Sequence, residues 1–412
     1  MKSFNFHIEH KCPRCGAPAI LEETDRLFTC PFCRVKSFLL EHDYFRYMFP
    51  YPDNPKGPPV CFPYWRFKGI LYSCGPAGTE HKFIDLSRQA LVSEYFPASL
   101  GIRSQALKLK FALPETEGTF IRPVLSQPDI IHGIRKLFSS QMDGNKEIQS
   151  FIGETTSIIY APFHVINDKL YDSILDMPVL SRLPDDFDIS GYPAEKPDWP
   201  ITFVPALCPA CGWDLAGERD SLALLCRNCD SAWHHRNKRL EKIDMGYIPG
   251  GSDNHLFLPF WMIRAGFSGI DSQSYADFIK STGLPAVDKE SRNEVTFTFW
   301  IPAFKIRAHH FLRIAKQMTF VQPLDEVTEK VPDGKMHPVT LPVTEAIESI
   351  KIVMAGLIKS KKDIFPSLID AVIMPDSSCL VYVPFRTGHH DLINEKYSVA
   401  LNNNILSTAG NL

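Results

Sequence analysis

Four pairs of cysteines with one shared spacing constrain this chain more than any other feature. Two residues separate the cysteines of each pair, and the pairs form two clusters with the pattern C-x2-C-x14-C-x2-C. Each pair fits a tight turn whose thiolates point at one ion, and two such turns complete a tetrahedral shell that suits zinc and leaves no position for a substrate. The predicted metal ligands are Cys12, Cys15, Cys30 and Cys33 in the first cluster and Cys208, Cys211, Cys226 and Cys229 in the second.

The predicted role of these metals is structural. A module of roughly 25 residues buries too little apolar surface to fold unaided, so metal binding has to supply the missing stability. Iron is the alternative to zinc, because Cys12–Gly16 and Cys208–Gly212 look like the metal-binding turns of rubredoxin, an electron carrier. The 14-residue gap is short for rubredoxin, and Arg34 and Asp230 replace glycine after the second pair of each cluster. We therefore expect two structural Zn²⁺ ions per chain.

Both clusters resemble the zinc-ribbon superfamily, which includes the ribbons of transcription factors and of bacterial zinc-ribbon proteins. The resemblance covers residues 12–33 and 208–229. Around it, the Pro-x-Trp sequences Pro63–Trp65 and Pro259–Trp261 are similar to a group of uncharacterised bacterial proteins in which a ribbon precedes a β-rich domain. These resemblances imply a metal-stabilised fold, and they imply no particular activity.

The sequence also contains an internal repeat. Adding 196 to a residue number maps the first cysteine cluster onto the second, and three further blocks follow in the same order in both halves. The matched blocks are Cys12 with Cys208, Pro63–Trp65 with Pro259–Trp261, Phe96–Ala98 with Ile301–Ala303, and Ile159–Phe163 with Val381–Phe385. This order predicts an internal duplication into copy one and copy two.

We expect an α+β fold in which each copy is a four-cysteine ribbon followed by an antiparallel or mixed sheet with a few helices. The predicted domains are ribbon 1 (residues 1–45), α+β domain 1 (46–183), a Pro-rich linker (184–203), ribbon 2 (204–240) and α+β domain 2 (241–412).

Periodicity places the main elements inside each copy. Aromatic strands are predicted over Val60–Tyr72 and Leu256–Phe267, with Trp65 and Trp261 as core residues rather than stacking platforms. Apolar residues at helical spacing predict helices over 304–315 and 347–358, and a shorter one over 130–138. A hairpin should close each copy, with turns at Gly153–Thr155 and Pro375–Ser377.

Composition narrows the class of function. The net charge of −3 gives no global field that would favour nucleic acid or an anionic membrane. The phosphate-loop and nucleophile-elbow motifs are absent from the sequence, so no catalytic residue is predicted. Paired C-x2-C cysteines favour a reducing compartment, and neither a signal-peptide pattern nor an apolar stretch of spanning length occurs, so we expect a cytoplasmic protein.

Two functional hypotheses follow. The first is a non-catalytic zinc-binding adaptor or scaffold whose partners are other proteins. The second is a nucleic-acid-binding protein that contacts phosphates through the basic segment after ribbon 2, with Arg236, Lys238 and Arg239 as the candidate residues. A rubredoxin-like electron carrier is a lesser alternative.

Overall fold

The computed structural model describes most of the 412-residue chain. The described residues are 7–40, 43–50, 59–75, 78–101, 108–139, 147–180, 182–185, 187–199, 201–236, 239–250, 254–270, 279, 282, 296–358 and 365–407.

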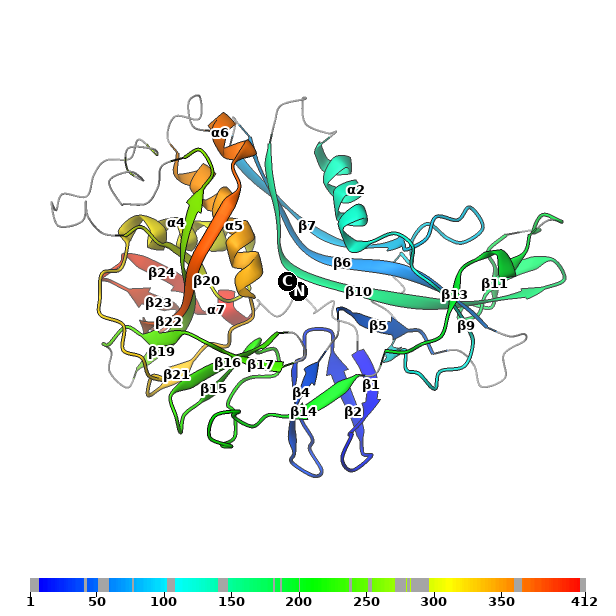
Figure 1. Cartoon of the computed structure of the whole chain (residues 1–412), viewed down its shortest axis with the longest axis horizontal. Helices are drawn as coiled ribbons and strands as arrows, with labels where there is room; N and C mark the ends of the chain where they lie inside the picture. The colour runs from blue at the N-terminus through cyan, green and yellow to red at the C-terminus, as the bar shows by residue number, and fades with distance from the viewer. Residues whose placement is uncertain are drawn as a thin grey trace. The chain divides into compact units, whose positions relative to one another are not determined.

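The chain divides into two compact units that exchange segments. Unit 1 comprises Met1–Lys68, Ile84–Gln141 and Glu154–Pro205, and unit 2 comprises Gly69–Phe83, Met142–Gly153 and Ala206–Leu412. Three long strands therefore contribute residues to both units. These are β6 (Val60–Gly75), β7 (Gly78–Gln89) and β10 (Ile148–Ile166) (Figure 1).

Unit 1 is built around a mixed sheet with the strand order β13-β9-β6-β10-β5-β8-β1-β2. Strand β7 adds to β6, and β11 and β12 extend from β10, while β3, β4 and β14 form a separate small sheet. The remaining elements of unit 1 are β1 (His7–Lys11), β2 (Pro18–Glu22), β3 (Leu27–Thr29), β4 (Lys36–Leu40), β5 (Phe45–Met48), β8 (Leu109–Phe111), β9 (Thr119–Ile121), α2 (Gln127–Ser139), β11 (Lys169–Asp172), β12 (Met177–Pro178), the 3-10 helix η1 (Ile189–Gly191), β13 (Ala194–Glu195) and β14 (Thr202–Pro205).

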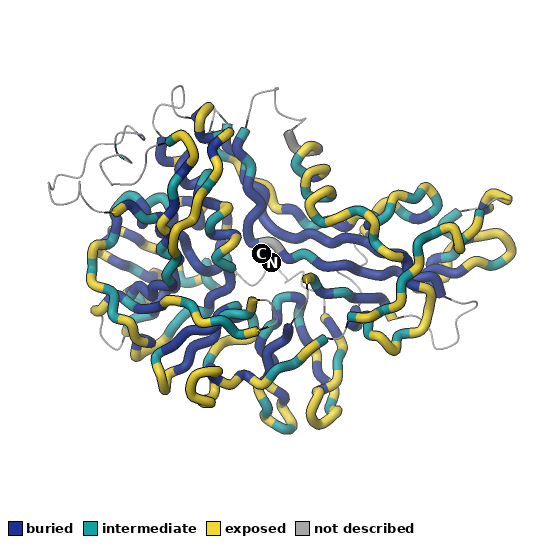
Figure 2. Tube along the Cα trace, viewed as in Figure 1, coloured by how far each residue is buried: buried dark blue, intermediate teal, exposed yellow. Residues whose placement is uncertain are grey.

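The aromatic strand β6 is buried along almost its whole length, as Figure 2 shows. Its run of apolar residues lacks polar alternation because both faces are covered. The Trp65 indole, 1% exposed, donates a 2.8 Å hydrogen bond from Nε1 to Leu125 O. The predicted strand and the predicted core role of Trp65 are both confirmed.

Residues of the predicted linker take part in the sheets of unit 1. Strand β13 pairs with β9, and β14 pairs antiparallel with β4, the second strand of the small sheet in ribbon 1. Phe203 in β14 stacks on the His10 ring at 4.9 Å and meets the Phe28 ring edge-on at 6.3 Å. This stretch therefore contributes strands to the sheets, although its sequence has the prolines typical of an interdomain linker.

Unit 2 contains a second mixed sheet with the strand order β20-β19-β22-β23-β24, to which β18 and β21 add. Strands β15, β16 and β17 form the small sheet of ribbon 2. The elements are β15 (Ala223–Cys226), β16 (Ser231–Arg236), β17 (Arg239–Ile243), β18 (Met245–Tyr247), β19 (His255–Phe267), β20 (Phe299–Pro302), α4 (Ala308–Val321), β21 (Lys335–Met336), α5 (Val343–Leu357), α6 (Phe365–Asp370), β22 (Ile373–Thr387), β23 (Asp391–Asn394), β24 (Val399–Asn402) and α7 (Asn403–Ser407). The helices predicted near 304–315, 347–358 and 130–138 are confirmed as α4, α5 and α2.

Helix α5 is buried on nearly all sides because strand segments from the first half of the chain join the core of unit 2. The Tyr72 hydroxyl in β6 donates to Ala308 O at 3.2 Å, and the Ser150 hydroxyl in β10 donates to Glu348 O at 2.9 Å. Ile70 and Ile152 belong to the same apolar core as the helices. A helix buried over most of its surface needs such cover on more than one side.

The predicted closing hairpins are wrong. Strand β22 runs without a break through Pro375–Ser377, and β10 runs through Gly153–Thr155. In β22 the register against β19 shifts between Arg264 and Ala265, so the turn-forming residues make a β-bulge. In β10, Gly153 has a φ of 73° within the continuing strand. In both strands the turn-forming residues distort the strand locally, and the chain does not reverse its direction.

The two halves contain matching hydrogen bonds to backbone carbonyls. Trp261 Nε1 donates to Leu341 O at 2.9 Å, as Trp65 does to Leu125 O. Ala90 N donates to Pro63 O, and Ala303 N donates to Pro259 O, both at 3.0 Å. In this pattern Ala303 corresponds to Ala90, whereas the sequence comparison had matched it with Ala98.

Candidate metal centres

Centre 1 brings together the four predicted cysteines of ribbon 1. The sulfur-to-sulfur distances are 3.8 Å for Cys12 and Cys33 and 3.7 Å for Cys15 and Cys30, and all four sulfurs lie within 4.8 Å of one another. Zinc–thiolate bonds of about 2.3 Å would separate the sulfurs of a tetrahedron by about 3.8 Å. The four thiols therefore fit one tetrahedral ion.

Centre 2 has the same arrangement in ribbon 2. Cys208 Sγ lies 3.6 Å from Cys229 Sγ, and Cys211 Sγ lies 3.5 Å from Cys226 Sγ. All four sulfurs again lie within 4.8 Å of one another. Every predicted ligand is thus in one of two four-sulfur clusters, and the donor set fits zinc or another thiophilic ion.

The turns that carry the cysteines have one backbone conformation. The residue after each pair is left-handed, with φ values of 71° at Gly16, 59° at Arg34, 74° at Gly212 and 48° at Asp230. The N–H groups of Gly16, Arg34 and Gly212 return to the carbonyl of the first cysteine of their pair at 2.8–2.9 Å. Replacing glycine with Arg34 or Asp230 leaves the turn conformation intact, so these two residues carry no argument about which metal binds.

Backbone N–H groups prepare individual thiols for ionisation. At Cys30 the N–H of Cys33 is the largest influence and, together with that of Phe32, lowers the pKa of the thiol to about 6 against the opposing effect of burial. At Cys208 burial acts to raise the pKa, but the N–H groups of Cys211 and Ala210 outweigh it and bring the pKa to about 6. Thiolates are the metal-binding form, so each centre contains a ligand that ionises readily.

Side chains around the sulfurs differ between the centres. At centre 2, Ser231 Oγ lies 3.1 Å from Cys229 Sγ and 3.8 Å from Cys208 Sγ, and Trp233 Nε1 donates to Ser231 Oγ at 2.9 Å. The Asn228 side chain hydrogen-bonds Cys211 and, as the largest influence there, lowers the pKa of that thiol. Asn228 and Ser231 each lie within two residues of a ligand, so the sequence beside the cysteines held the signal for these two donors.

Ribbon 1 is fixed to its unit by a buried ion network. Arg66 in β6 and Glu23 in the turn after β2 are each 1% exposed, and Arg66 Nε lies 3.4 Å from Glu23 Oε1. Arg66 also pairs with Asp85 in β7. Burying these groups is tolerable because each carboxylate pairs with the Arg66 guanidinium.

Ribbon 2 is held by hydrogen bonds to a loop of its own unit. Asp230 Oδ1 accepts from Val331 N at 3.0 Å, and the Arg227 guanidinium donates to Pro332 O at 3.3 Å and Gly334 O at 3.4 Å. In ribbon 1 the corresponding positions are Arg34 and Pro31, which are exposed. The metal-bearing end of ribbon 2 is therefore anchored through residues that ribbon 1 lacks.

The basic segment forms the end of the β16–β17 hairpin. Arg236 and Arg239 face each other across the two strands, and both are exposed. His234 and Glu241 form the next pair on the same face. Lys238, the third predicted nucleic-acid contact, lies outside the described residues.

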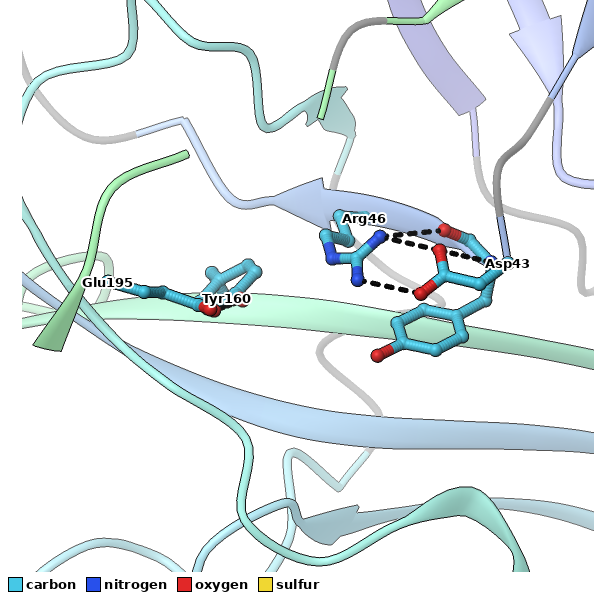
Figure 3. A network of polar contacts seen from close by, with 5 residues as sticks. Asp43, Arg46, Tyr160 and Glu195 are labelled. Atoms are coloured by element: carbon cyan, nitrogen blue, oxygen red, sulfur yellow. Dashed lines mark hydrogen bonds and ion pairs between the residues drawn. The ribbon is translucent and has the colours of Figure 1, made fainter. Parts of the chain in front are cut away.

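A second polar cluster, which the sequence did not predict, lies in unit 1 (Figure 3). Asp43 accepts two hydrogen bonds from the Arg46 guanidinium at 2.8 and 3.0 Å, and that guanidinium lies 4.8 Å from the Trp199 ring. The Tyr160 hydroxyl donates to Glu195 at 2.9 Å, and burial raises the pKa of this carboxyl group. These contacts fasten Glu195 and Trp199 to β5 and β10, which is a structural role.

All eleven cysteines are free of disulfides, and Cys61 and Cys74 are fully buried outside the clusters. Cys379 is half-buried.

Within the part of the chain that the structure describes, none of the helices combines the length and apolarity needed to cross a membrane.

A scan against protein-family models, a search of curated proteins and a search of solved structures found no match to this chain.

Proposed function

We propose that this protein is a non-catalytic adaptor whose two four-cysteine centres hold structural zinc and whose surfaces bind other proteins, in the cytoplasm. The observation that carries the proposal is the pair of closed cysteine shells, with opposite sulfurs 3.5–3.8 Å apart. Four protein thiolates leave a tetrahedral ion no position for a substrate or an activated water. Such centres contribute folding energy and present a rigid surface.

Exposed aromatic residues at the metal-bearing ends support the adaptor role. Phe32, between two ligands of centre 1, is 67% exposed, and Trp213, two residues after a ligand of centre 2, is 60% exposed. Aromatic side chains are enriched in protein interfaces, where they act as anchors. Each ribbon thus offers an apolar anchor on a metal-stiffened turn.

A groove formed by ribbon 1 and the chain around β8 also favours a polypeptide partner. It is open, has a volume of about 940 Å³ and runs along β1, β2 and β8. Its lining combines apolar side chains such as Phe111 with charges of both signs, among them Lys11 and Glu115. Small-molecule sites are more enclosed and more apolar.

We also propose that the two halves arose by duplication, with the sequence boundaries at 1–183 and 204–412. Support comes from the matched tryptophan and alanine hydrogen bonds. In addition, a short strand that follows each ribbon pairs in parallel with the long closing strand, β5 with β10 and β18 with β22. Two unrelated folds would share such details only by coincidence.

Nucleic-acid binding is the second candidate, because Arg236 and Arg239 lie side by side at an exposed hairpin end. Two guanidinium groups so placed suit adjacent phosphates. Glu241, one pair further along the same face, offsets part of this charge, and the chain's net charge of −3 gives no wider attraction.

The deciding experiment is affinity capture of the full tagged chain from native lysate, with and without nuclease, and with metal content measured on the same sample. The adaptor proposal expects two zinc ions per chain and protein partners that survive nuclease. Phe32→Ser and Trp213→Ser should release those partners, while Val92→Ser, at a 78% exposed apolar position outside both ribbons, should retain them.

Nuclease-sensitive recovery that Arg236→Ala and Arg239→Ala abolish would favour the nucleic-acid function instead. Iron in place of zinc would favour the alternative of a rubredoxin-like electron carrier. Partners that all three serine variants retain would remove the role given to the exposed aromatic residues.

A further inference from the structure

The direction of the hydrogen bonds at centre 2 follows from the groups involved. An indole N–H can only donate, so Ser231 Oγ accepts from Trp233 Nε1 at 2.9 Å. A metal-bound thiolate has no hydrogen, so it can only accept. The Ser231 hydroxyl hydrogen is therefore directed at Cys229 Sγ, 3.1 Å away, rather than at the more distant Cys208 Sγ.

Asn228 supplies a second side-chain donor at centre 2, toward Cys211. Two of the four sulfurs therefore accept a hydrogen bond from a side chain in addition to those from the turn backbone. Such donors withdraw electron density from a thiolate and stabilise the anion.

Centre 1 has apolar residues at the matching positions. Val35 corresponds to Ser231, and Phe32 corresponds to Asn228, by the offset that aligns the two cysteine clusters. Neither side chain can donate. Within the described part of ribbon 1, these sulfurs interact with backbone N–H groups and with one another.

If solvent exposure alone set the reactivity of the cysteines, the two centres would react equally fast or centre 2 would react faster. Cys15 and Cys211 are both exposed, whereas Cys229 is exposed and its counterpart Cys33 is half-buried. A difference in favour of centre 1 would therefore have to come from the electron density on sulfur, which the hydrogen bonds control.

We propose that centre 1 is the reactive, exchangeable metal site of this chain, open to soft electrophiles, and that centre 2 retains its ion. This rests on the proposed function only in that both clusters bind metal. In the reaction with iodoacetamide, the sulfur lone pair of a ligand forms an S–C bond, the C–I bond breaks and iodide leaves with its electron pair. The resulting neutral thioether is a much weaker ligand, and the ion is released.

The test treats the zinc-loaded full chain with iodoacetamide and follows released zinc with a coloured chelator. Mass spectrometry of the peptides assigns each alkylated cysteine to its centre. We expect release in two steps, with centre 1 reacting about ten-fold faster or more, since neighbours of metal ligands change affinity and activity on that scale. Equal rates, or faster loss from centre 2, would overturn the proposal.

Reciprocal variants separate the hydrogen bond from other differences. Ser231→Ala removes the donor with little change in volume and should accelerate alkylation at centre 2 toward the rate of centre 1. Asn228→Leu should add to that effect, and Val35→Ser should slow centre 1. Trp233→Phe leaves the Ser231 hydroxyl in place and should have the smallest effect. If Ser231→Ala leaves the centre 2 rate unchanged, the hydroxyl does not protect the thiolate.

A spectroscopic measurement gives an answer that does not depend on reagent access. With Co²⁺ in place of zinc, the thiolate-to-metal charge-transfer band should lie at longer wavelength for centre 1, because its sulfur lone pairs are less stabilised. Ser231→Ala should move the centre 2 band in the same direction. Two metals with indistinguishable bands would contradict this inference alone, whereas failure to bind metal at all would contradict the proposed function as well.

Discussion

Ribbon 1 and ribbon 2 share one cysteine spacing, one turn conformation and one sulfur geometry, yet different kinds of interaction attach them to their units. Ribbon 1 is attached through the buried Arg66–Glu23 ion pair. In ribbon 2, Asp230 accepts a hydrogen bond from the backbone N–H of Val331, and Arg227 donates to the backbone carbonyl of Pro332. The sulfur geometry of each turn is local, and it is the same in both ribbons. Attachment involves residues far apart in sequence, and there the two ribbons differ.

The largest expected effect comes from removing a metal ligand. Cys12→Ser should cost the chain one of its two metals and the hydrogen-exchange protection of ribbon 1 only, and Cys208→Ser should do the same for ribbon 2, because each metal supplies the folding energy of its own module. Native mass spectrometry and hydrogen exchange by mass spectrometry measure both quantities. Retention of two metals in either variant would refute the ligand assignment.

The ion network of ribbon 1 should give the next largest effect. Arg66→Met removes the guanidinium that pairs with the buried Glu23 and with Asp85, so the free energy of unfolding should fall by about 3–5 kcal/mol in urea titrations. The control is Arg264→Met, which removes an exposed pair with Asp376 at 3.2 Å and should change stability by less than about 1 kcal/mol. Similar losses of unfolding free energy in the two variants would show that burial does not increase the contribution of the ion network to stability.

The tryptophan hydrogen bonds test how far the two halves are equivalent. Trp65→Phe and Trp261→Phe each remove an indole that donates to a carbonyl at 2.8 or 2.9 Å and leave that oxygen unpaired. Each should lower stability by about 1–3 kcal/mol, and the two losses should be alike. A large loss of stability for one variant and none for the other would contradict the equivalence of the two tryptophans, on which the duplication proposal relies.

The smallest effect should come from the residues with left-handed backbone. Arg34→Gly relieves an unfavourable φ of 59° and should stabilise ribbon 1 by up to about 1 kcal/mol, less the greater freedom of glycine in the unfolded chain. Asp230→Gly gains the same relief but loses the bond to Val331 N, so its net effect should be near zero or destabilising. Thermal unfolding of the two variants beside Arg34→Ala, which offers no relief, checks the sign.

Sequence reasoning succeeded where the relevant interactions are close along the chain. A cysteine pair and its turn span five residues, so spacing alone located all eight sulfurs of the two centres. The aromatic strands and the helices α4 and α5 were also predicted, because their apolar periodicity is a local signal. The asymmetry between Ser231 and Val35 was likewise visible in the sequence, although its meaning required the 3.1 Å contact with Cys229.

Tertiary structure alone decided which segments pair over long distances. Pro375–Ser377 has turn-forming residues, but pairing with β19 on both sides makes a continuous strand energetically better than a reversal, and the extra residue becomes a bulge. The Pro-rich stretch before ribbon 2 supplies β14 to a sheet of ribbon 1, and the ends of β6 and β10 complete the core around α5. The cysteine spacing by itself identified the sulfurs of both centres, since each C-x2-C turn is formed within five residues, although the sulfurs that meet belong to cysteines 15 or 21 residues apart. Strand partners depend on surfaces that exist only after the chain has folded, so no local pattern encodes them.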